Sequence, residues 1–191
     1  METDGRGIRT LVIFSSCPLR CKYCANPYTR DGSRKSILDT PADLLRAVSV
    51  DSIYFQATGG GITFGGGEPL LHTDFICEFI DLAPKSWNYC IETSLAVPLD
   101  SVKRVAERIS HFVVDIKSMD AEIYQDYTGG DLSLARENLT ELLRLIGPDR
   151  ITVRVPEIPS YADKRSQRRS VKALRAMGIT HIDVFRYTVK G

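Results

Sequence analysis

Strand-like and helix-like segments alternate along almost the whole of this chain. Short apolar runs rich in β-branched and aromatic residues predict buried strands, and they occur at residues 10–14, 61–64, 89–93, 112–117, 151–155 and 181–187. Helical patterns lie between them, at residues 41–48, 74–82, 99–109, 132–145 and 166–177. This alternation predicts βαβ units and an α/β fold with a parallel sheet.

The signals at the helix ends and the number of strand–helix units further restrict which α/β fold the chain can adopt. Thr40 before Pro41 is expected to be an N-cap with proline in the first turn, and Gly147 and Gly178 are expected to end helices. About six strand–helix units are too few for a closed eight-stranded barrel. A chain of 191 residues suits one domain over residues 1–191. In such sheets, functional sites form at the carboxyl ends of the strands.

Composition excludes several classes of function. The net charge is +1, which gives no electrostatic reason to expect binding to nucleic acid or to a membrane surface. No apolar run approaches the roughly 18 residues of a transmembrane helix, and the polar N-terminus does not resemble a signal peptide. Reduced thiols are typical of the cytoplasm, so we expect a cytoplasmic protein.

Three cysteines follow the first predicted strand in the spacing C-x3-C-x2-C: Cys17, Cys21 and Cys24. Iron–sulfur clusters are normally held by four cysteines, so three would leave one iron of a [4Fe–4S] cluster open to a small molecule. Zinc is the alternative, but structural zinc takes four ligands, usually in two pairs, and no second pair follows. The spacing favours the cluster.

The remaining metal-ligating or charged residues form no such pattern. Cys77 and Cys90 stand alone in apolar surroundings and are expected to be core residues. The three histidines show no ligand spacing and are interpreted as structural; they are His72, His111 and His181. The basic run at residues 164–169 is interpreted as a solvated face rather than a binding surface.

A glycine-rich segment at residues 58–69, TGGGITFGGGEP, follows the cysteines at the distance of one βα unit. With residues 4–9, DGRGIR, and the cysteine triplet, it resembles the radical S-adenosylmethionine (SAM) superfamily. Within it, the chain is most similar to the glycyl radical enzyme activating enzymes, the family of the pyruvate formate-lyase activating enzyme. The resemblance runs from Asp4 to about Tyr187 and implies an open, partial (β/α)6 TIM-like barrel with parallel strands.

The resemblance also implies a set of ligands. Cys17, Cys21 and Cys24 would bind one [4Fe–4S] cluster, and the open iron would take the amino and carboxylate groups of SAM. The residues between Cys24 and the glycine-rich segment contain no further cysteine, so no ferredoxin-like insert with extra clusters is expected. Further contacts to SAM are implied for Tyr23, Gly66, Gly67, Glu68, Asp115, Lys117 and Arg154.

Some of these residues have an alternative interpretation, and some positions carry a different residue from the one typical of the family. Asp115 and Lys117, two residues apart on one strand, point to the same face and could form an ordinary ion pair. Glu92 and Asp115 could flank a monovalent cation. Gly65 stands where relatives carry serine, and Thr188 stands where they carry a histidine that contacts the adenosine. Arg154, in an apolar strand, requires a partner.

The resemblance predicts an anaerobic activating enzyme. It would cleave SAM reductively and abstract a hydrogen atom from a glycine of a partner glycyl radical enzyme, with a flavodoxin- or ferredoxin-type electron donor. It is expected to act as a monomer, and the chain could be truncated at its C-terminus. Two alternatives remain open: a radical SAM enzyme acting on a small molecule or a peptide, and a non-catalytic iron–sulfur electron carrier.

Overall fold

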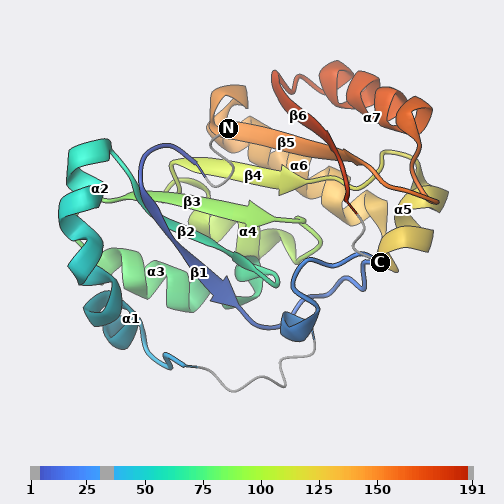
Figure 1. The fold of residues 1–191 in the computed structure, drawn as a ribbon. Helices are drawn as coiled ribbons and strands as arrows, with labels where there is room; N and C mark the ends of the chain where they lie inside the picture. The colour runs from blue at the N-terminus through green and yellow to red at the C-terminus, as the bar shows by residue number, and fades with distance from the viewer. Residues whose placement is uncertain (1–4, 31–36, 189–191) are drawn as a thin grey trace.

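The protein is described by a computed structural model that covers residues 5–30 and 37–188. Its centre is one sheet of six parallel strands in chain order (Figure 1). The strands are β1 (Arg9–Phe14), β2 (Gly61–Gly66), β3 (Asn88–Thr93), β4 (His111–Asp115), β5 (Ile151–Glu157) and β6 (His181–Arg186). β1 pairs with β2 and β6 with β5, but not with each other, so the sheet is open. The predicted open partial barrel is therefore confirmed.

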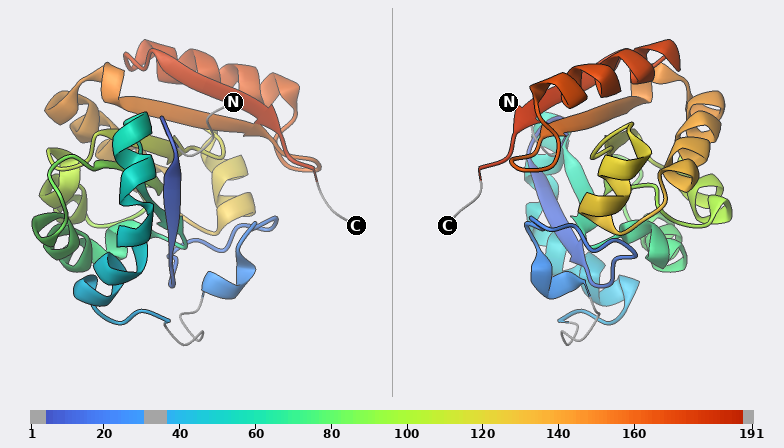
Figure 2. Two further views of the ribbon diagram at one scale, coloured as in Figure 1. Left: turned by 60° about the vertical axis from the view of Figure 1, so that its left-hand side comes forward. Right: turned by 90° about the vertical axis from the view of Figure 1, so that its right-hand side faces the viewer.

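Helices connect the strands, and most of them cover the outer face of the curved sheet, whereas the helix at Ala121–Thr128 lies beyond the carboxyl ends of the strands (Figure 1 and Figure 2). They are α1 (Pro41–Val48), α2 (Ser52–Thr58), α3 (Thr73–Leu82), α4 (Leu99–Ala106), α5 (Ala121–Thr128), α6 (Leu132–Ile146) and α7 (Lys164–Ala176). Short 3-10 turns occur at η1 (Pro27–Thr29), η2 (Ser49–Asp51), η3 (Pro69–His72) and η4 (Pro148–Arg150). In the described part of the chain, no helix has the length and apolar character needed to cross a membrane.

The predicted helices are all present, and their marked ends have the expected geometry. The Thr40 hydroxyl oxygen accepts a hydrogen bond from the Asp43 N–H at 3.1 Å, and Gly147 follows α6 with a φ of 74°. Helices α2 and α5 were not predicted. α2 buries only Phe55 and leaves Ile53 71% exposed, so its sequence lacks the apolar stripe that identifies a helix.

The main core lies between the sheet and the outer helices. β2 is buried over Gly61–Gly65, and its Phe64 packs against the rings of Phe79 and Tyr89 at 5.8 and 6.2 Å. Cys90 of β3 is buried, whereas Cys77 of α3 is half-buried against this core. Because side chains alternate along a strand, the opposite face of the sheet is free to carry polar residues, and it does so on β3, β4 and β5.

Candidate functional site

The cysteine loop, which follows β1 and carries all three cysteines, is bound to the end of α5. The backbone N–H groups of Arg20 and Lys22 donate to the carbonyl oxygens of Thr128 and Tyr127, at 2.7 and 3.1 Å. Ser16, just before the first cysteine, has a φ of 71°, a conformation that non-glycine residues rarely adopt. These contacts hold the loop over the carboxyl ends of the strands, where parallel sheets place their sites.

The glycine-rich loop at the end of β2 is bound directly to the cysteine loop. The N–H groups of Gly67 and Glu68 donate to the carbonyl oxygens of Phe14 and Ser16, at 2.9 and 2.8 Å. A side chain at Gly67 would place its Cβ 2.3 Å from the Ser16 carbonyl oxygen. Glycine is required here because the two loops approach through their backbones. The structure therefore brings two predicted motifs, 50 residues apart in sequence, into contact.

We expect Gly67→Ala to separate these two loops. The Cβ would collide with backbone atoms, which cannot rotate away, so the free energy of unfolding should fall by about 1–3 kcal/mol and iron incorporation should fall with it. Urea unfolding and iron content per chain measure both effects. Gly65→Ala is the matched control, because its Cβ would meet the flexible Leu11 side chain at 3.3 Å. Equal losses in the two variants would contradict the close-approach argument.

Glu68 was predicted to contact SAM, and the structure places its side chain inside the protein. The carboxylate is fully buried and accepts hydrogen bonds from the Leu70 N–H, the Thr93 hydroxyl, and the N–H and hydroxyl of Ser94. Burial raises the pKa of Glu68, and the hydrogen bonds from Ser94 and Thr93 oppose that rise. The side chain thus joins the glycine-rich loop to the end of β3 and fixes the position of both.

Arg154 has the partners that its apolar strand required. Its guanidinium donates two hydrogen bonds to Asp115, from Nε to Oδ1 and from Nη2 to Oδ2, both at 3.1 Å. A third runs from Nη1 to Oε1 of Glu92 at 3.3 Å. Burial alone would lower the pKa of Arg154, but the two carboxylates raise it. Arg154 thus supplies positive charge between Glu92 and Asp115, where a monovalent cation was predicted.

Lys117 lies just beyond β4 and completes this network. Its ammonium lies 3.4 Å from Oδ1 of Asp115, so the predicted ion pair is present. It also donates a hydrogen bond to the hydroxyl of Tyr187 at 2.9 Å and lies 5.6 Å from the centre of that ring. Burial alone would lower the pKa of Lys117, but Asp115 and Tyr187 raise it. Tyr187 was not predicted as a site residue, because nothing local in the sequence marks a contact 70 residues away.

An aromatic cluster lies beside the cysteine loop. Tyr23, within the cysteine triplet, contacts the rings of Tyr127 and Tyr161 at 6.1 and 5.8 Å, and Tyr127 also stacks on Tyr187. Cys21 also packs against this cluster, whose buried residues are Tyr127, Ile158 and Ala162. Thr188, the departure noted from the sequence, is exposed. The residue that follows β6, Tyr187, therefore joins this network, and Thr188 does not.

The cysteines themselves fit a cluster held by three thiolates. Each is half-buried. Burial raises the pKa of Cys17 to about 11, and Glu68 and the other two thiols add to the rise. Burial also raises the pKa of Cys21, against the effect of Lys117. The three cysteines lie within eight residues of one loop, Cys17 to Cys24. Iron binding there would displace the protons that burial retains, so loading is coupled to proton release.

Among the described residues, no three His, Cys, Asp or Glu side chains converge on one point that could hold a single metal ion. A [4Fe–4S] cluster needs no such convergence, because each cysteine binds a different iron. The donor set of three sulfur atoms on one loop therefore suits a cluster with one open iron.

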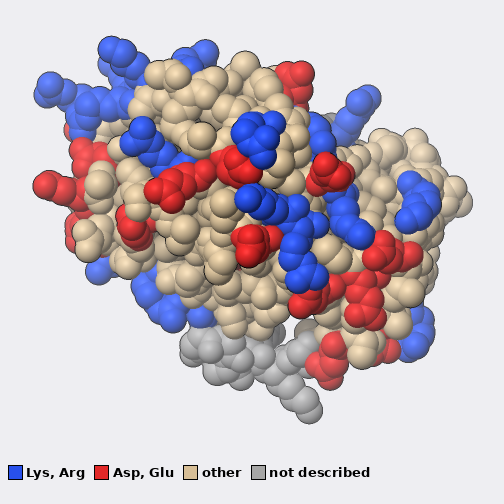
Figure 3. Space-filling model, turned by 180° about the vertical axis from the view of Figure 1, so that it is seen from behind, with Lys and Arg blue, Asp and Glu red and all other residues tan. Residues whose placement is uncertain are grey.

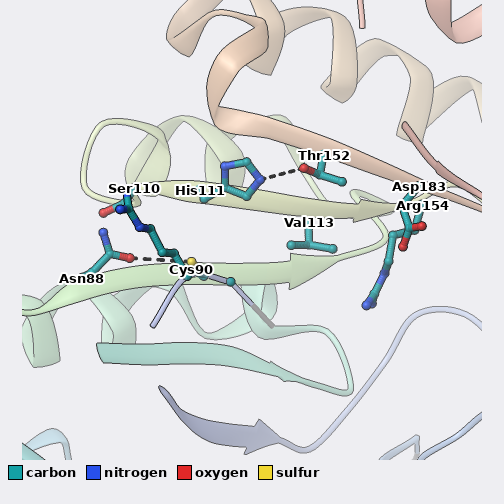
Figure 4. Close-up of a pocket in the computed structure, with 10 residues that line it drawn as sticks. Asn88, Cys90, Ser110, His111, Val113, Thr152, Arg154 and Asp183 are labelled. Carbon is teal, nitrogen blue, oxygen red and sulfur yellow. Dashed lines mark hydrogen bonds between the residues drawn. The ribbon is translucent and has the colours of Figure 1, made fainter. Parts of the chain in front are cut away.

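A cavity of about 450 Å3 adjoins the network on the side where the strands begin (Figure 4). Residues of β3 to β6 line it together with residues near the N-terminus, and the side chains of Asn88, His111, Thr152, Arg154 and Asp183 are among the polar ones. His111 is fixed by a 2.8 Å hydrogen bond to Thr152, in line with its predicted structural role. The interior of this open sheet is thus partly hollow, unlike the packed interior of a closed barrel.

Comparisons with known proteins agree with this geometry. The sequence model of the Radical SAM superfamily matches residues 11–164. The pyruvate formate-lyase 2-activating enzyme of Escherichia coli (strain K12) is 28% identical over 96% of this chain and 73% of its own length. The pyruvate formate-lyase-activating enzyme of Clostridium pasteurianum is 33% identical over 66% of this chain and 52% of its own. The indoleacetate decarboxylase activating enzyme of Tractidigestivibacter scatoligenes is 26% identical over 84% of this chain and 71% of its own length.

Solved structures show the same fold at low identity. Streptococcus suis SuiB bound to the precursor peptide SuiA has a TM-score of 0.72 at 16% identity, over 95% of this chain and 40% of that one. The enzyme anSMEcpe with bound AdoMet and a Kp18Cys peptide has a TM-score of 0.72 at 17% identity, over 96% and 53%. This chain spans about half or less of each of those chains.

Proposed function

Because this chain belongs to the radical SAM superfamily of enzymes, we propose that it activates a partner glycyl radical enzyme by abstracting a hydrogen atom from a glycine of that partner. The family implies a [4Fe–4S] cluster and SAM. We also propose that residues 1–191 form one radical SAM core domain with a single cluster. Support for the activating role comes from the relatives, which are activating enzymes at 26–33% identity.

One structural observation carries the proposal: the cysteine loop, the glycine-rich loop and the charged strand ends meet at one edge of the sheet. The cysteine loop is hydrogen-bonded to the glycine-rich loop. The charge of Lys117 opposes part of the rise that burial causes in the pKa of Cys21. An electron carrier would need the cysteines alone. The additional glycine loop and the buried charges favour an enzyme that also binds a polar organic molecule.

In this proposal Cys17, Cys21 and Cys24 hold three irons and leave the fourth for the amino and carboxylate groups of SAM. When bound, the cluster and SAM supply the one-electron chemistry, in which the sulfonium is cleaved to methionine and a 5′-deoxyadenosyl radical. The protein binds and orients the cluster and SAM, and it excludes water from them. Gly66 and Gly67 let the backbone approach the ligand, since no side chain intervenes.

The charged residues would hold the polar groups of SAM. Lys117 and Arg154 supply donors for its carboxylate or ribose, and Asp115 keeps both cations in place. Tyr23 would lie near the adenine. A monovalent cation beside Glu92 and Asp115 stays a prediction, and it would have to share both carboxylates with Arg154.

We expect Tyr187→Phe to weaken SAM binding about tenfold, because Lys117 loses the hydroxyl that fixes its ammonium. The ring remains, so its stacking on Tyr127 is kept. The dissociation constant for SAM is measured by titration of the reduced cluster, followed by its electron paramagnetic resonance (EPR) spectrum. If Tyr187 acts through Lys117, the double variant with Lys117→Met should bind SAM no more weakly than Lys117→Met alone.

Tyr161→Phe is the control for this experiment, since it removes a hydroxyl from the same aromatic cluster but not one bonded to Lys117. It should leave the dissociation constant unchanged. Unfolding of the cluster-free protein in urea should give the same free energy for wild type and Tyr187→Phe within about 1 kcal/mol. A loss of stability without a loss of SAM affinity would make Tyr187 a structural residue only.

The proposed function is tested anaerobically with the reconstituted, reduced protein. SAM should be converted to 5′-deoxyadenosine. Addition of a glycyl radical enzyme, such as pyruvate formate-lyase, should produce a glycyl radical signal in the EPR spectrum. 5′-Deoxyadenosine without any glycyl radical, across a panel of such enzymes, would favour a small-molecule or peptide substrate. A full cluster that gives no product and no spectral change with SAM would favour the electron carrier.

A further inference from the structure

Helix α7 carries a continuous stripe of positive charge. Its sequence, KRSQRRSVKALRA, holds six cations and no acidic residue. At about 100° per residue the six cations fall within an arc of about 140°, and the buried residues Ser166, Ser170 and Leu174 lie on the opposite side. All six are exposed: Lys164, Arg165, Arg168, Arg169, Lys172 and Arg175. Figure 3 shows Lys and Arg side chains gathered over this helix, at the upper left.

This cationic stripe costs folding stability. Cations four residues apart repel each other by about 0.2–0.5 kcal/mol per pair, and the stripe has three such pairs: 164 with 168, 165 with 169, and 168 with 172. Lys164 and Arg165 also lie at the positive end of the helix dipole. Among the described residues, Arg169 alone of the six forms an ion pair, with Asp120 at 3.6 Å. The stripe is solvated, as predicted, and apart from Arg169 its cations form no ion pair that would offset their repulsion within the described part of the chain.

The loop that leads into the stripe contacts the cysteine loop. The loop between β5 and α7 packs its Tyr161 ring against Tyr23, with the ring centres 5.8 Å apart. Asp163 then caps α7, accepting a hydrogen bond from the Ser166 N–H at 2.7 Å. Only two residues, Ala162 and Asp163, separate Tyr161 from Lys164, the first cation of the stripe. A protein that binds the first turns of α7 therefore also approaches the segment that carries the cysteines.

We propose that the cationic stripe of α7 is the docking surface for an acidic, one-electron carrier protein that reduces the cluster. This inference rests on the proposed function, which consumes one electron for each SAM cleaved. The reduced carrier would lose one electron, the oxidised cluster would gain it, and the carrier would leave in its oxidised form. The stripe would act on the encounter between the two proteins and not on the cleavage of SAM.

Charge and position together select this partner. The chain as a whole has a net charge of only +1, so the positive charge is concentrated locally on this helix. Six cations there create a local electric field that attracts a negatively charged protein surface. Such fields raise association rates by 10- to 1,000-fold and weaken as salt is added. Electron-transfer contacts are small and short-lived, and charge suits them better than an apolar interface. A nucleic acid would share the charge preference, but nothing relates it to the cysteine loop.

The test compares two electron sources for the same holoenzyme. Arg165→Glu/Arg168→Glu reverses two stripe charges. With a reduced acidic flavodoxin as donor, kcat/KM for the donor should fall at least about tenfold at low salt, and its dependence on salt should weaken. With dithionite as donor, 5′-deoxyadenosine formation should equal that of wild type. Dithionite needs no docking surface, so it reports the proposed function separately.

The matched control is Arg46→Glu/Lys85→Glu, which makes the same charge change at exposed positions on and near other helices. It should keep the wild-type rate with flavodoxin. Equal losses in the two variants, an unchanged flavodoxin rate in the stripe variant, or a parallel loss with dithionite would each overturn the proposal. Binding of oxidised flavodoxin to the holoenzyme, measured against salt, tests the surface even where SAM is not cleaved. Stripe-dependent binding of a DNA duplex in place of flavodoxin would also overturn it.

Discussion

Cys21→Ala should abolish 5′-deoxyadenosine formation and most of the iron content of the reconstituted protein. The remaining cysteines, Cys17 and Cys24, can hold only two irons, and a cluster with two protein ligands is not retained. Cys21 also packs against the aromatic cluster beside Lys117. Its loss therefore removes a ligand that packs against the same aromatic cluster as Tyr23, one of the residues proposed to hold SAM. Iron content, the visible absorption of the cluster and product formation are measured on the same anaerobic sample.

Cys77→Ser is the control for this variant. Cys77 is half-buried on α3, and its sulfur lies 3.8 Å from the carbonyl oxygen of Arg104. It lies outside the cysteine loop, so full iron content and full activity are expected. Retained SAM cleavage in Cys21→Ala would show that the cysteine triplet does not hold the catalytic cluster. Loss of iron in Cys77→Ser would show that a thiol outside the triplet takes part.

Glu68→Gln should lower the free energy of unfolding by about 2–4 kcal/mol, although it changes only one atom of the side chain. Each carboxylate oxygen accepts a backbone N–H: Oε1 from Leu70 at 3.2 Å and Oε2 from Ser94 at 2.9 Å. An amide has one oxygen, so in either orientation its NH2 group faces a backbone donor in a fully buried position. Urea unfolding of the cluster-free protein measures the loss.

The pH dependence of this loss has a definite sign. Burial raises the pKa of Glu68 in the folded state, so the folded protein binds that proton more tightly than the unfolded chain does. The stability contributed by this group is therefore greatest below its unfolded pKa and declines as the pH rises through the folded pKa. Glutamine does not titrate, so the deficit of Glu68→Gln relative to wild type should shrink as the pH rises.

Glu78→Gln is the matched control, because Glu78 is exposed on α3. It should change the free energy of unfolding by less than about 0.5 kcal/mol and add no pH dependence. A Glu68→Gln variant as stable as wild type would mean that the carboxylate does not hold the glycine-rich loop to the end of β3. Its SAM contact, predicted from the sequence, would then become the better account of the residue.

The sequence determined the features that are local. Alternating apolar runs and helical stripes predict the six strands and five of the helices, because backbone geometry sets the periods of two and 3.6 residues. The cysteine triplet is equally local, since its three ligands lie within eight residues of one loop. Helix α2 was not predicted because it buries only Phe55 and shows no apolar stripe. Helix α5 was not predicted either; it buries Tyr124, Tyr127 and Thr128.

Tertiary structure alone decided which charges meet. Arg154 reaches Glu92 across 62 residues of sequence, and Lys117 reaches Tyr187 across 70. Each contact spans one intervening strand of the sheet, so it depends on the order of the strands. The sequence could place Glu68 at a strand end but could not show that its carboxylate turns inward to Ser94. Partner choice among buried polar groups depends on which donors and acceptors the packed chain brings within about 3 Å. Such distances follow from the arrangement of the whole sheet and not from any local pattern.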